Sequence, residues 1–440
     1  MASVAVTVKV RDFYDDHPYP PPVENLERYQ CRWQDPQRRR ADFHLFWPGR
    51  KYREDQSILV AGCGTSQAVK HALRWPAAQV TGIDCSATSI RHTERLKKQH
   101  GLKNLQTRQL AIEDVSALGM SFDQIVCTGV LHHLEDPKAG LIALRTVLKP
   151  QGAMQLMVYA PYGRAGIYML QEFCRRVGIR ATRTGIRDLI RALSALPAGH
   201  PLQAILTQAP ELRSEAALAD ALLHPQDRAY SVPQFFDLIE NAGLAFGRWL
   251  RQAPYSVHCG VISQLPQVAE IAHLPWHEQC AAIELFRGTM SRHSAVIYPN
   301  DYSGGSSDIN FRGDDWLKYV PMRMSDTICV QEQVPSGASA VLINRTHTYK
   351  DLFLAMGPAE NKLFDAIDGQ QTIGEILDGT LSATDSARRI GLARSFFERL
   401  WWHDQVVFET RMQARNVPLG SVLLDSTLGS DRRELPESLK

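Results

Sequence analysis

The chain has 440 residues, of which 44% are hydrophobic and 22% charged, a composition that suits two or three globular domains. Its net charge of +2 gives no bulk attraction to nucleic acid or to a membrane surface, and no apolar run approaches the roughly 18 residues of a membrane span. The eight cysteines lack zinc-binding spacing and the N-terminus lacks a signal-peptide pattern, so we expect no metal and a cytoplasmic location. The sequence does not indicate an oligomeric state.

Residues 1–50 are predicted to form an N-terminal arm. The prolines within Asp12–Tyr29 oppose a helix and favour an extended chain. Phe13, Tyr14 and Tyr19 are too many aromatic side chains for a free tail. The arm therefore packs on the domain to bury its rings, or it covers a bound cofactor or substrate. On the second interpretation Tyr19 is a candidate substrate contact.

Next comes a strand–turn–helix–strand pattern. An apolar run at Ile58–Ala61 predicts a strand, a glycine turn follows, and Ala68–Trp75 reads as a helix that Pro76 ends. A second strand over 79–83 ends on Asp84. This order is the first half of a nucleotide-binding α/β unit, in which the ligand lies at the carboxyl ends of parallel strands.

The glycine turn favours one class of nucleotide over another. Gly62 and Gly64 let the backbone turn sharply and approach a ligand, and Asp84 stands about 20 residues further on, where an acid accepts ribose hydroxyls. The dinucleotide fingerprint requires a glycine where Gln67 stands, because the pyrophosphate needs a close helix start. An NAD-dependent oxidoreductase is therefore disfavoured. A ligand with ribose and adenine but no phosphate, such as S-adenosylmethionine, fits the turn.

Three more strands are expected, at 105–110, 122–130 and 153–159. The fourth strand runs into Leu131-His132-His133-Leu134, and a helix over 139–148 stops at Lys149-Pro150-Gln151-Gly152.

The Gly-Cys-Gly-Thr turn and the Val-Leu-His-His-Leu and Leu-Lys-Pro-x-Gly segments resemble the class I S-adenosylmethionine-dependent methyltransferases. The resemblance implies an α/β fold with a Rossmann-like, seven-stranded sheet that has one antiparallel edge. Residues 12–298 also look like a bacterial methyltransferase group that is sometimes fused to tetratricopeptide repeats, which are absent here. The contacts to S-adenosylmethionine implied by the resemblance are Ala61, Gly62, Cys63, Gly64, Asp84, Cys85, Ile112, Glu113 and Thr128.

Three positions depart from the family pattern. Val60 replaces the acid usually found before the turn, Ser66 replaces a glycine, and Ala111 stands where an acid would contact adenine. These departures motivate an alternative function, a catalytically inactive S-adenosylmethionine-binding regulatory or scaffold protein.

The rest of the chain is predicted as a lid and an accessory domain. Residues 161–225 read as a helical insertion over the carboxyl edge of the sheet, and two final strands at 246–251 and 257–262 close a methyltransferase domain of residues 51–265. A smaller α+β accessory domain follows at 266–412. Its part at about 345–410 has a winged-helix-like pattern, and residues 413–440 are expected to be a disordered tail.

Methyl transfer from a sulfonium is an in-line displacement, so the enzyme contributes mainly alignment, with a general base only where the acceptor loses a proton. The candidate catalytic residues are His132, Tyr159 and Tyr162. His133 is a further candidate base or orienter, although a bond to the backbone or a helix cap is the favoured interpretation for it. The candidate substrate contacts are Tyr19, Arg164, Arg228 and Tyr230. The acceptor is open between a peptide or protein side chain and a small metabolite.

Overall fold

The computed structural model describes residues 2–208, 214–302, 309–381 and 386–411. The predicted tail at 413–440 lies outside these residues. Within them, no helix is both long enough and apolar enough to cross a membrane.

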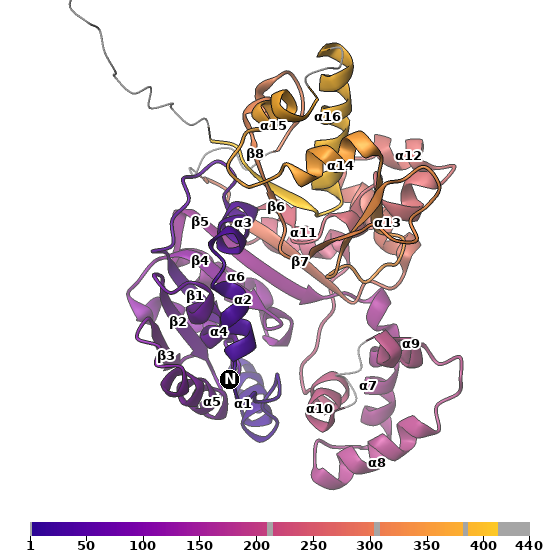
Figure 1. The fold of residues 1–440 in the computed structure, drawn as a ribbon. Helices are drawn as coiled ribbons and strands as arrows, with labels where there is room; N and C mark the ends of the chain where they lie inside the picture. Colours follow the sequence, from indigo (N-terminus) through magenta and orange to yellow (C-terminus); the bar gives the residue numbers. More distant parts are fainter. Residues whose placement is uncertain (1, 209–213, 303–308, 382–385, 412–440) are drawn as a thin grey trace, which may run out of the picture.

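A seven-stranded sheet forms the centre of the molecule (Figure 1), in the order β3-β2-β1-β4-β5-β7-β6. The first five strands are parallel, and β7 runs antiparallel to both β5 and β6. The expected Rossmann-like, seven-stranded sheet is confirmed, but its antiparallel strand, β7, is not at the edge as expected and lies between β5 and the edge strand β6. Its strands are β1 (Ser57–Ala61), β2 (Gln79–Asp84), β3 (Leu105–Gln109), β4 (Phe122–Thr128), β5 (Leu148–Tyr159), β6 (Leu244–Trp249) and β7 (Arg292–Pro299).

Helices cover both faces of the sheet because its strands are apolar on both sides. Along β1, Ile58 and Val60 enter one core, whereas Leu59 and Ala61 enter the other. The first core includes α3 (Pro36–Phe46), α4 (Gln67–Arg74) and α5 (Ala87–Gln99). The second includes α6 (Pro137–Thr146), α11 (Val232–Glu240) and α13 (Trp276–Arg287).

The prediction for the last two strands is half right. β6 lies close to the predicted 246–251, but residues 257–262 form no strand, and a short 3-10 helix begins at Gly260. The seventh strand is Arg292–Pro299, so the sheet extends past residue 265, where its domain was expected to end. A short apolar run in the sequence does not distinguish a strand from a buried turn. Neighbouring residues also do not indicate which sheet a strand joins.

The N-terminal arm is more helical than predicted. Helix α1 (Ala2–Asp16) precedes the prolines, and α2 (Glu27–Trp33) follows them. Within Asp12–Tyr29, only residues 17–26 lie outside a helix, because the prolines at 18 and 20–22 act locally.

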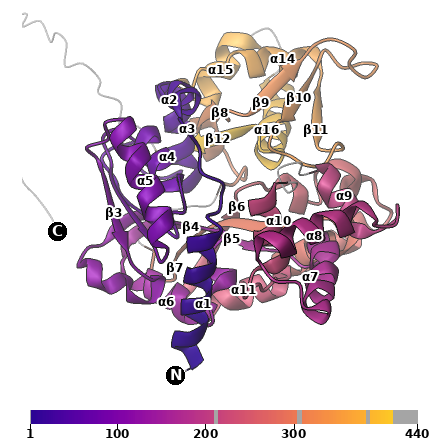
Figure 2. The ribbon, with the colours of Figure 1, turned by 90° about the horizontal axis from the view of Figure 1, so that it is seen from below.

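The predicted helical insertion is present between β5 and α11. It comprises α7 (Ala165–Val177), α8 (Arg183–Ser194), α9 (Pro201–Gln208) and α10 (Glu215–Leu223). These helices share a small core of their own that contains Ile167, Leu189 and Leu218. Figure 2 shows them as a lobe beside α1. Phe13 of α1 packs against Ile186 and Ala219 of this lobe.

The C-terminal part, after a short α12 (Val268–His273) and α13, has its own core. Its strands pair as β11-β10-β9 and β12-β8. Asp404 links it to the sheet domain, because its carboxylate accepts the N–H groups of Gln252 and Ala253 at 3.0 Å each. The winged-helix-like character of residues 345–410 stays a prediction. The elements are β8 (Val320–Arg323), β9 (Thr327–Val330), β10 (Ala340–Asn344), β11 (Phe353–Met356), α14 (Pro358–Asp365), α15 (Ile373–Thr380), α16 (Ser386–Trp402) and β12 (Val406–Glu409).

Candidate functional site

The glycine turn follows β1 at the carboxyl edge of the sheet. Gly62 and Gly64 have φ of 68° and 52°, in the left-handed region that favours glycine. A Cβ on Gly62 would lie 2.3 Å from Cγ2 of Val130, so Val130 can pack on the turn only because this position has no side chain. The turn therefore brings backbone, rather than side chains, to the edge of the sheet.

A cleft of about 990 Å³, part of it open to solvent, lies above this turn. Side chains at the ends of parallel strands line it, as in other open α/β sheets: Asp84 is the last residue of β2, Thr128 of β4 and Tyr159 of β5. Its lining also includes Tyr14, Tyr19, Pro20, Gly62, Gly64, Gln67, Cys85, Ser89, Ile112, Glu113, His133, Leu134 and Asp220.

Asp84 is held by two backbone groups. Its carboxylate accepts the N–H of Gly64 at 2.8 Å and that of Ser86 at 2.9 Å. Burial raises the pKa of Asp84 to about 6, against the two hydrogen bonds that lower it. The acid is therefore fixed in orientation, and it keeps lone pairs that can accept further hydroxyl donors.

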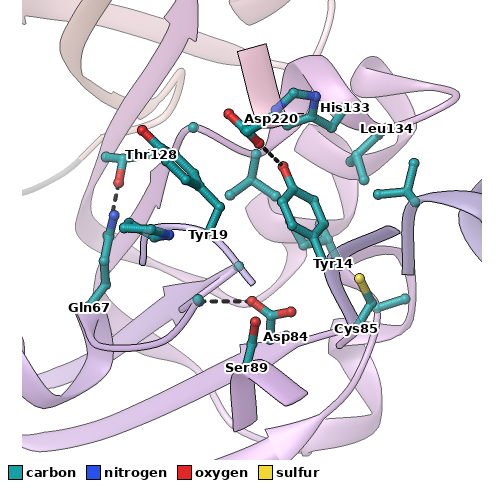
Figure 3. Close-up of a pocket in the computed structure, with 18 of the residues that line it drawn as sticks. Tyr14, Tyr19, Gln67, Asp84, Cys85, Ser89, Thr128, His133, Leu134 and Asp220 are labelled. Carbon is teal, nitrogen blue, oxygen red and sulfur yellow. Dashed lines mark hydrogen bonds between the residues drawn. The ribbon is translucent and has the colours of Figure 1, made fainter. Parts of the chain in front are cut away.

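Gln67 stands at the start of α4, where a dinucleotide fingerprint has its third glycine. Its Oε1 accepts a hydrogen bond from Thr128 Oγ1 at 3.0 Å, and its side chain lines the cleft (Figure 3). A side chain at this helix start is unsuited to a pyrophosphate, which needs close approach to the backbone N–H groups.

The N-terminal arm covers the turn. Thr65 Oγ1 donates to the carbonyl of Pro20 at 2.8 Å, and a Cβ on Gly64 would lie 3.2 Å from Pro20 Cδ. Asp15 accepts from Ser86 Oγ at 2.7 Å and from the N–H of Thr88 at 3.0 Å, at the start of α5. Of the two interpretations of the arm, both its packing and its covering position are therefore observed.

Tyr14, His133 and Asp220 meet at the other end of the cleft and come from α1, the turn after β4, and α10. We call these three residues the acceptor half, and Gly62, Gly64 and Asp84 the cofactor half. Tyr14 donates its hydroxyl to Asp220 at 3.1 Å, as Figure 3 shows. Burial raises the pKa of the Asp220 carboxyl and that of the Tyr14 phenol.

Aromatic rings pack around His133. Its ring centroid lies 3.9 Å from that of His224 and 6.1 Å from that of Tyr14. His133 Nδ1 lies 2.7 Å from the carbonyl of Gln226, and the Gln226 N–H donates to His224 Nδ1 at 3.0 Å. The expected backbone bond of His133 is thus confirmed, and the same side chain also lines the cleft.

Nine of the sixteen predicted site residues line this cleft. They are Tyr19, Gly62, Gly64, Asp84, Cys85, Ile112, Glu113, Thr128 and Tyr159. Ala61 and Cys63 are fully buried beside the turn and do not belong to the lining. The Cys63 thiol packs against Gly82 instead, on the side of α4.

The other predicted residues lie elsewhere. His132 is buried behind the cleft with its ring centroid 3.9 Å from that of Tyr159, and Tyr162 is exposed on the surface. Arg164 does not clamp an acceptor, because its guanidinium stacks over Tyr159 and pairs with Asp227 at 3.2 Å. Tyr230 is buried in the second core, and Arg228 is exposed outside the cleft.

Sequence reasoning missed the site roles of Tyr14, Gln67 and Asp220, and for His133 it favoured a backbone bond over a role in the site. One signal was available for Asp220, because it is a lone acid within the apolar run Ala-Ala-Leu-Ala-Asp-Ala-Leu-Leu of α10. A charged residue is rarely buried unless it has a partner, so such an acid marks a specific contact.

Residues 59–154 match the family model described as a methyltransferase domain. An uncharacterized protein of Synechococcus is 35% identical over 253 residues, which cover 55% of this chain and 60% of that protein. A ubiquinone biosynthesis O-methyltransferase of Albidiferax ferrireducens is 33% identical over 98 residues, or 22% of this chain and 38% of its own length. The chain thus spans less than two thirds of these relatives.

The structure of PKMT2 from Rickettsia typhi in complex with AdoHcy superposes with a TM-score of 0.62 at 14% identity, covering 90% of this chain and 78% of that one. This likeness establishes the shared fold. The domain match and the strand order together show that the chain carries a methyltransferase domain with the Rossmann-like fold of the class I methyltransferases.

Proposed function

We propose that the protein transfers a methyl group from S-adenosylmethionine to a nucleophile bound in the acceptor half of the cleft. One observation carries the proposal: a single cleft joins the cofactor half to a buried polar cluster of three side chains. The first part suits the nucleoside, and the second offers partners to a reacting polar group.

The residues of the cofactor half fit the cofactor. The turn at Gly62 and Gly64 has no room for side chains, and backbone bonds already orient Asp84. In this proposal Asp84 accepts the ribose hydroxyls, and Ile112 and Glu113 border the adenine. PKMT2, which was solved with AdoHcy, has the same fold, and this supports placing a nucleoside thioether here.

We infer that the acceptor is a peptide or protein side chain, with a small metabolite as the second candidate. The four-helix lobe between β5 and α11 and the separate C-terminal core provide surface beyond what a small acceptor needs. In this proposal the lobe acts as a lid, because its residue Asp220 closes one end of the cleft. Alignment of acceptor, methyl carbon and sulfur then supplies most of the rate enhancement.

The test is transfer of a labelled methyl group into fractionated lysate, followed by identification of the labelled species. Asp84→Ala should abolish labelling while the protein keeps its melting temperature. Asp378→Ala is the matched control, because it removes an exposed carboxylate on α15, and it should label normally.

Binding of S-adenosylhomocysteine by calorimetry without any labelling would instead favour the inactive regulatory or scaffold function. The departures at Val60, Ser66 and Ala111 motivate that alternative. Val60 is a buried residue of β1, which gives it a packing role.

A further inference from the structure

One peptide unit, that of Gln226, fixes the protonation of two imidazoles. A carbonyl oxygen can only accept, so His133 Nδ1 must carry the proton that it donates to Gln226. The Gln226 N–H donates to Nδ1 of His224, so in the neutral ring the proton of His224 is on Nε2. His133 therefore presents a lone pair at Nε2, whereas His224 presents an N–H.

These roles argue against a metal ion in this cluster. His133, Asp220 and His224 have possible ligand atoms within 4.8 Å of one another, so distance alone would admit a cation. A metal would need a free lone pair from His224, but its Nδ1 is already an acceptor and its Nε2 carries the proton. Instead, His224 offers one donor, its Nε2–H, beside two acceptors, His133 Nε2 and the Asp220 carboxylate.

From this arrangement we propose that His133 Nε2 accepts the proton lost by the methyl acceptor, so that the substrate class is a nucleophile with an O–H or N–H to lose. This inference rests on the proposed function. It excludes acceptors without such a proton, such as a thioether or a tertiary amine.

Neither the phenols of Tyr14 and Tyr159 nor the imidazole of His224 suits this role as well. Burial raises the pKa of Tyr14 and that of Tyr159, so neither phenol is a ready proton acceptor. Burial lowers the pKa of His224 well below its usual value and leaves it a neutral donor. The titratable or charged groups around His133 are Tyr14, His132, Glu135, Tyr159, Arg164, Asp220, His224 and Asp227.

Methyl transfer at this site is a displacement at the methyl carbon that is coupled to a proton transfer. The acceptor's lone pair forms the new bond to the methyl carbon, and the pair of the breaking carbon–sulfur bond passes to sulfur, which turns the sulfonium into a neutral thioether. The acceptor's proton moves to His133 Nε2 and gives an imidazolium, which later loses it to solvent. Asp220 acts as a positioning residue, because its nearby carboxylate stabilises the imidazolium.

The decisive variant is His133→Asn. The Asn amide can still donate to the Gln226 carbonyl but has no group at the position of Nε2. We expect kcat to fall about 10²- to 10⁴-fold with the labelled-methyl assay and the labelled lysate fraction, while S-adenosylhomocysteine binds as in the wild type. A general base acts only when it is deprotonated, so the rate of methyl transfer by the wild type should rise with pH, and this rise should disappear in the variant. His277→Asn, on an exposed imidazole, is the matched control.

Asp220→Asn is the second variant and depends less on local packing, because the amide oxygen can still accept from Tyr14. Loss of the carboxylate makes the imidazolium less stable, so the rise of the rate should move to lower pH. An unchanged pH profile in both variants, with wild-type labelling intact, would overturn the inference. Loss of labelling on chelation with EDTA and its return with Zn²⁺ would also overturn it, in favour of a metal site. Absence of labelling by the wild type contradicts the proposed function itself.

Discussion

The two halves of the cleft are built in different ways. The cofactor half lies within one strand–helix–strand unit, and its contacts depend on backbone geometry and one acid. The acceptor half takes Tyr14, His133 and Asp220 from three segments that are far apart in the chain. Local geometry leaves a pattern in the sequence, whereas a cluster assembled by tertiary packing does not.

The two halves therefore tolerate different kinds of substitution. The two glycines of the cofactor half, Gly62 and Gly64, are constrained by space and by φ, so that almost any side chain is excluded there. A residue of the acceptor half is constrained by its polar atoms, so a change that keeps its shape and removes one atom isolates its chemistry.

The largest effect is expected from Gly62→Ala. The new Cβ would lie 2.3 Å from Val130 Cγ2, and φ of 68° costs a non-glycine residue roughly 1–2 kcal/mol. Together these should weaken S-adenosylhomocysteine binding by about 100-fold or more, measured by calorimetry. Adding Val130→Ala makes room for the Cβ and should recover part of the affinity. If the single variant binds as the wild type does, backbone approach does not limit this half.

The second effect concerns pH and Asp84. Since burial raises its pKa to about 6, the acid is neutral below that pH and accepts ribose hydroxyls less well. We expect affinity for S-adenosylhomocysteine to fall up to about tenfold per pH unit below pH 6. In the unliganded protein the same shift makes the free energy of unfolding fall as pH rises from about 4 to about 6, because the folded state binds more protons there.

Asp84→Asn removes this titration and is the control for it. The variant should bind more weakly than the wild type above pH 6, with an affinity that no longer changes across pH 5–7 from this group. A wild-type affinity that is flat over the same range would show that Asp84 is ionised throughout, and therefore less buried in solution than its surroundings indicate.

The sequence predicts the cofactor half and most of the sheet for the same physical reason. Alternating or continuous apolar runs of strand length, a glycine turn and a terminal acid are short-range signals, and β1, β2 and β4 formed where these indicated. β5 covers the predicted 153–159 but begins at Leu148, so the predicted break at 149–152 lies inside the strand. The last strand of the sheet was expected at 257–262, but it is β7. Ala295–Tyr298 of β7 looks like any short strand, and its contacts with β5, which is distant in sequence, decide which sheet it joins.

For the acceptor half, the sequence indicated the wrong residues, for a related reason. His132 and His133 are adjacent, and the turn after β4 sends one ring behind Tyr159 and the other into the cleft. Arg164 was expected near the substrate, but Asp227 and Tyr159 hold its charge within the protein. Only the folded chain decides which way such side chains face.

A third effect is expected from Tyr14→Phe. The change keeps the ring and removes the hydroxyl that Asp220 accepts at 3.1 Å, so a buried carboxylate loses one partner. A hydrogen bond to a charged group contributes about 1.5–3 kcal/mol, and we expect kcat/KM for methyl transfer to fall about 10- to 100-fold. S-adenosylhomocysteine affinity should change little. Equal losses in affinity and turnover would instead mean that the two halves act as one unit.

The smallest effect should come from Thr65→Val, which tests how firmly the arm closes on the turn. Valine keeps the shape of threonine but cannot donate to the Pro20 carbonyl, which Thr65 Oγ1 reaches at 2.8 Å. Loss of one neutral hydrogen bond costs about 0.5–1.5 kcal/mol, so amide exchange in residues 17–26 should speed up about 2- to 10-fold. The control is Thr107→Val, which removes the hydrogen bond from Thr107 of β3 to Glu94 of α5. It should leave amide exchange in the arm unchanged. Faster exchange in Thr65→Val together with an unchanged KM for the cofactor would mean that the arm closes over the cofactor half without limiting entry to it.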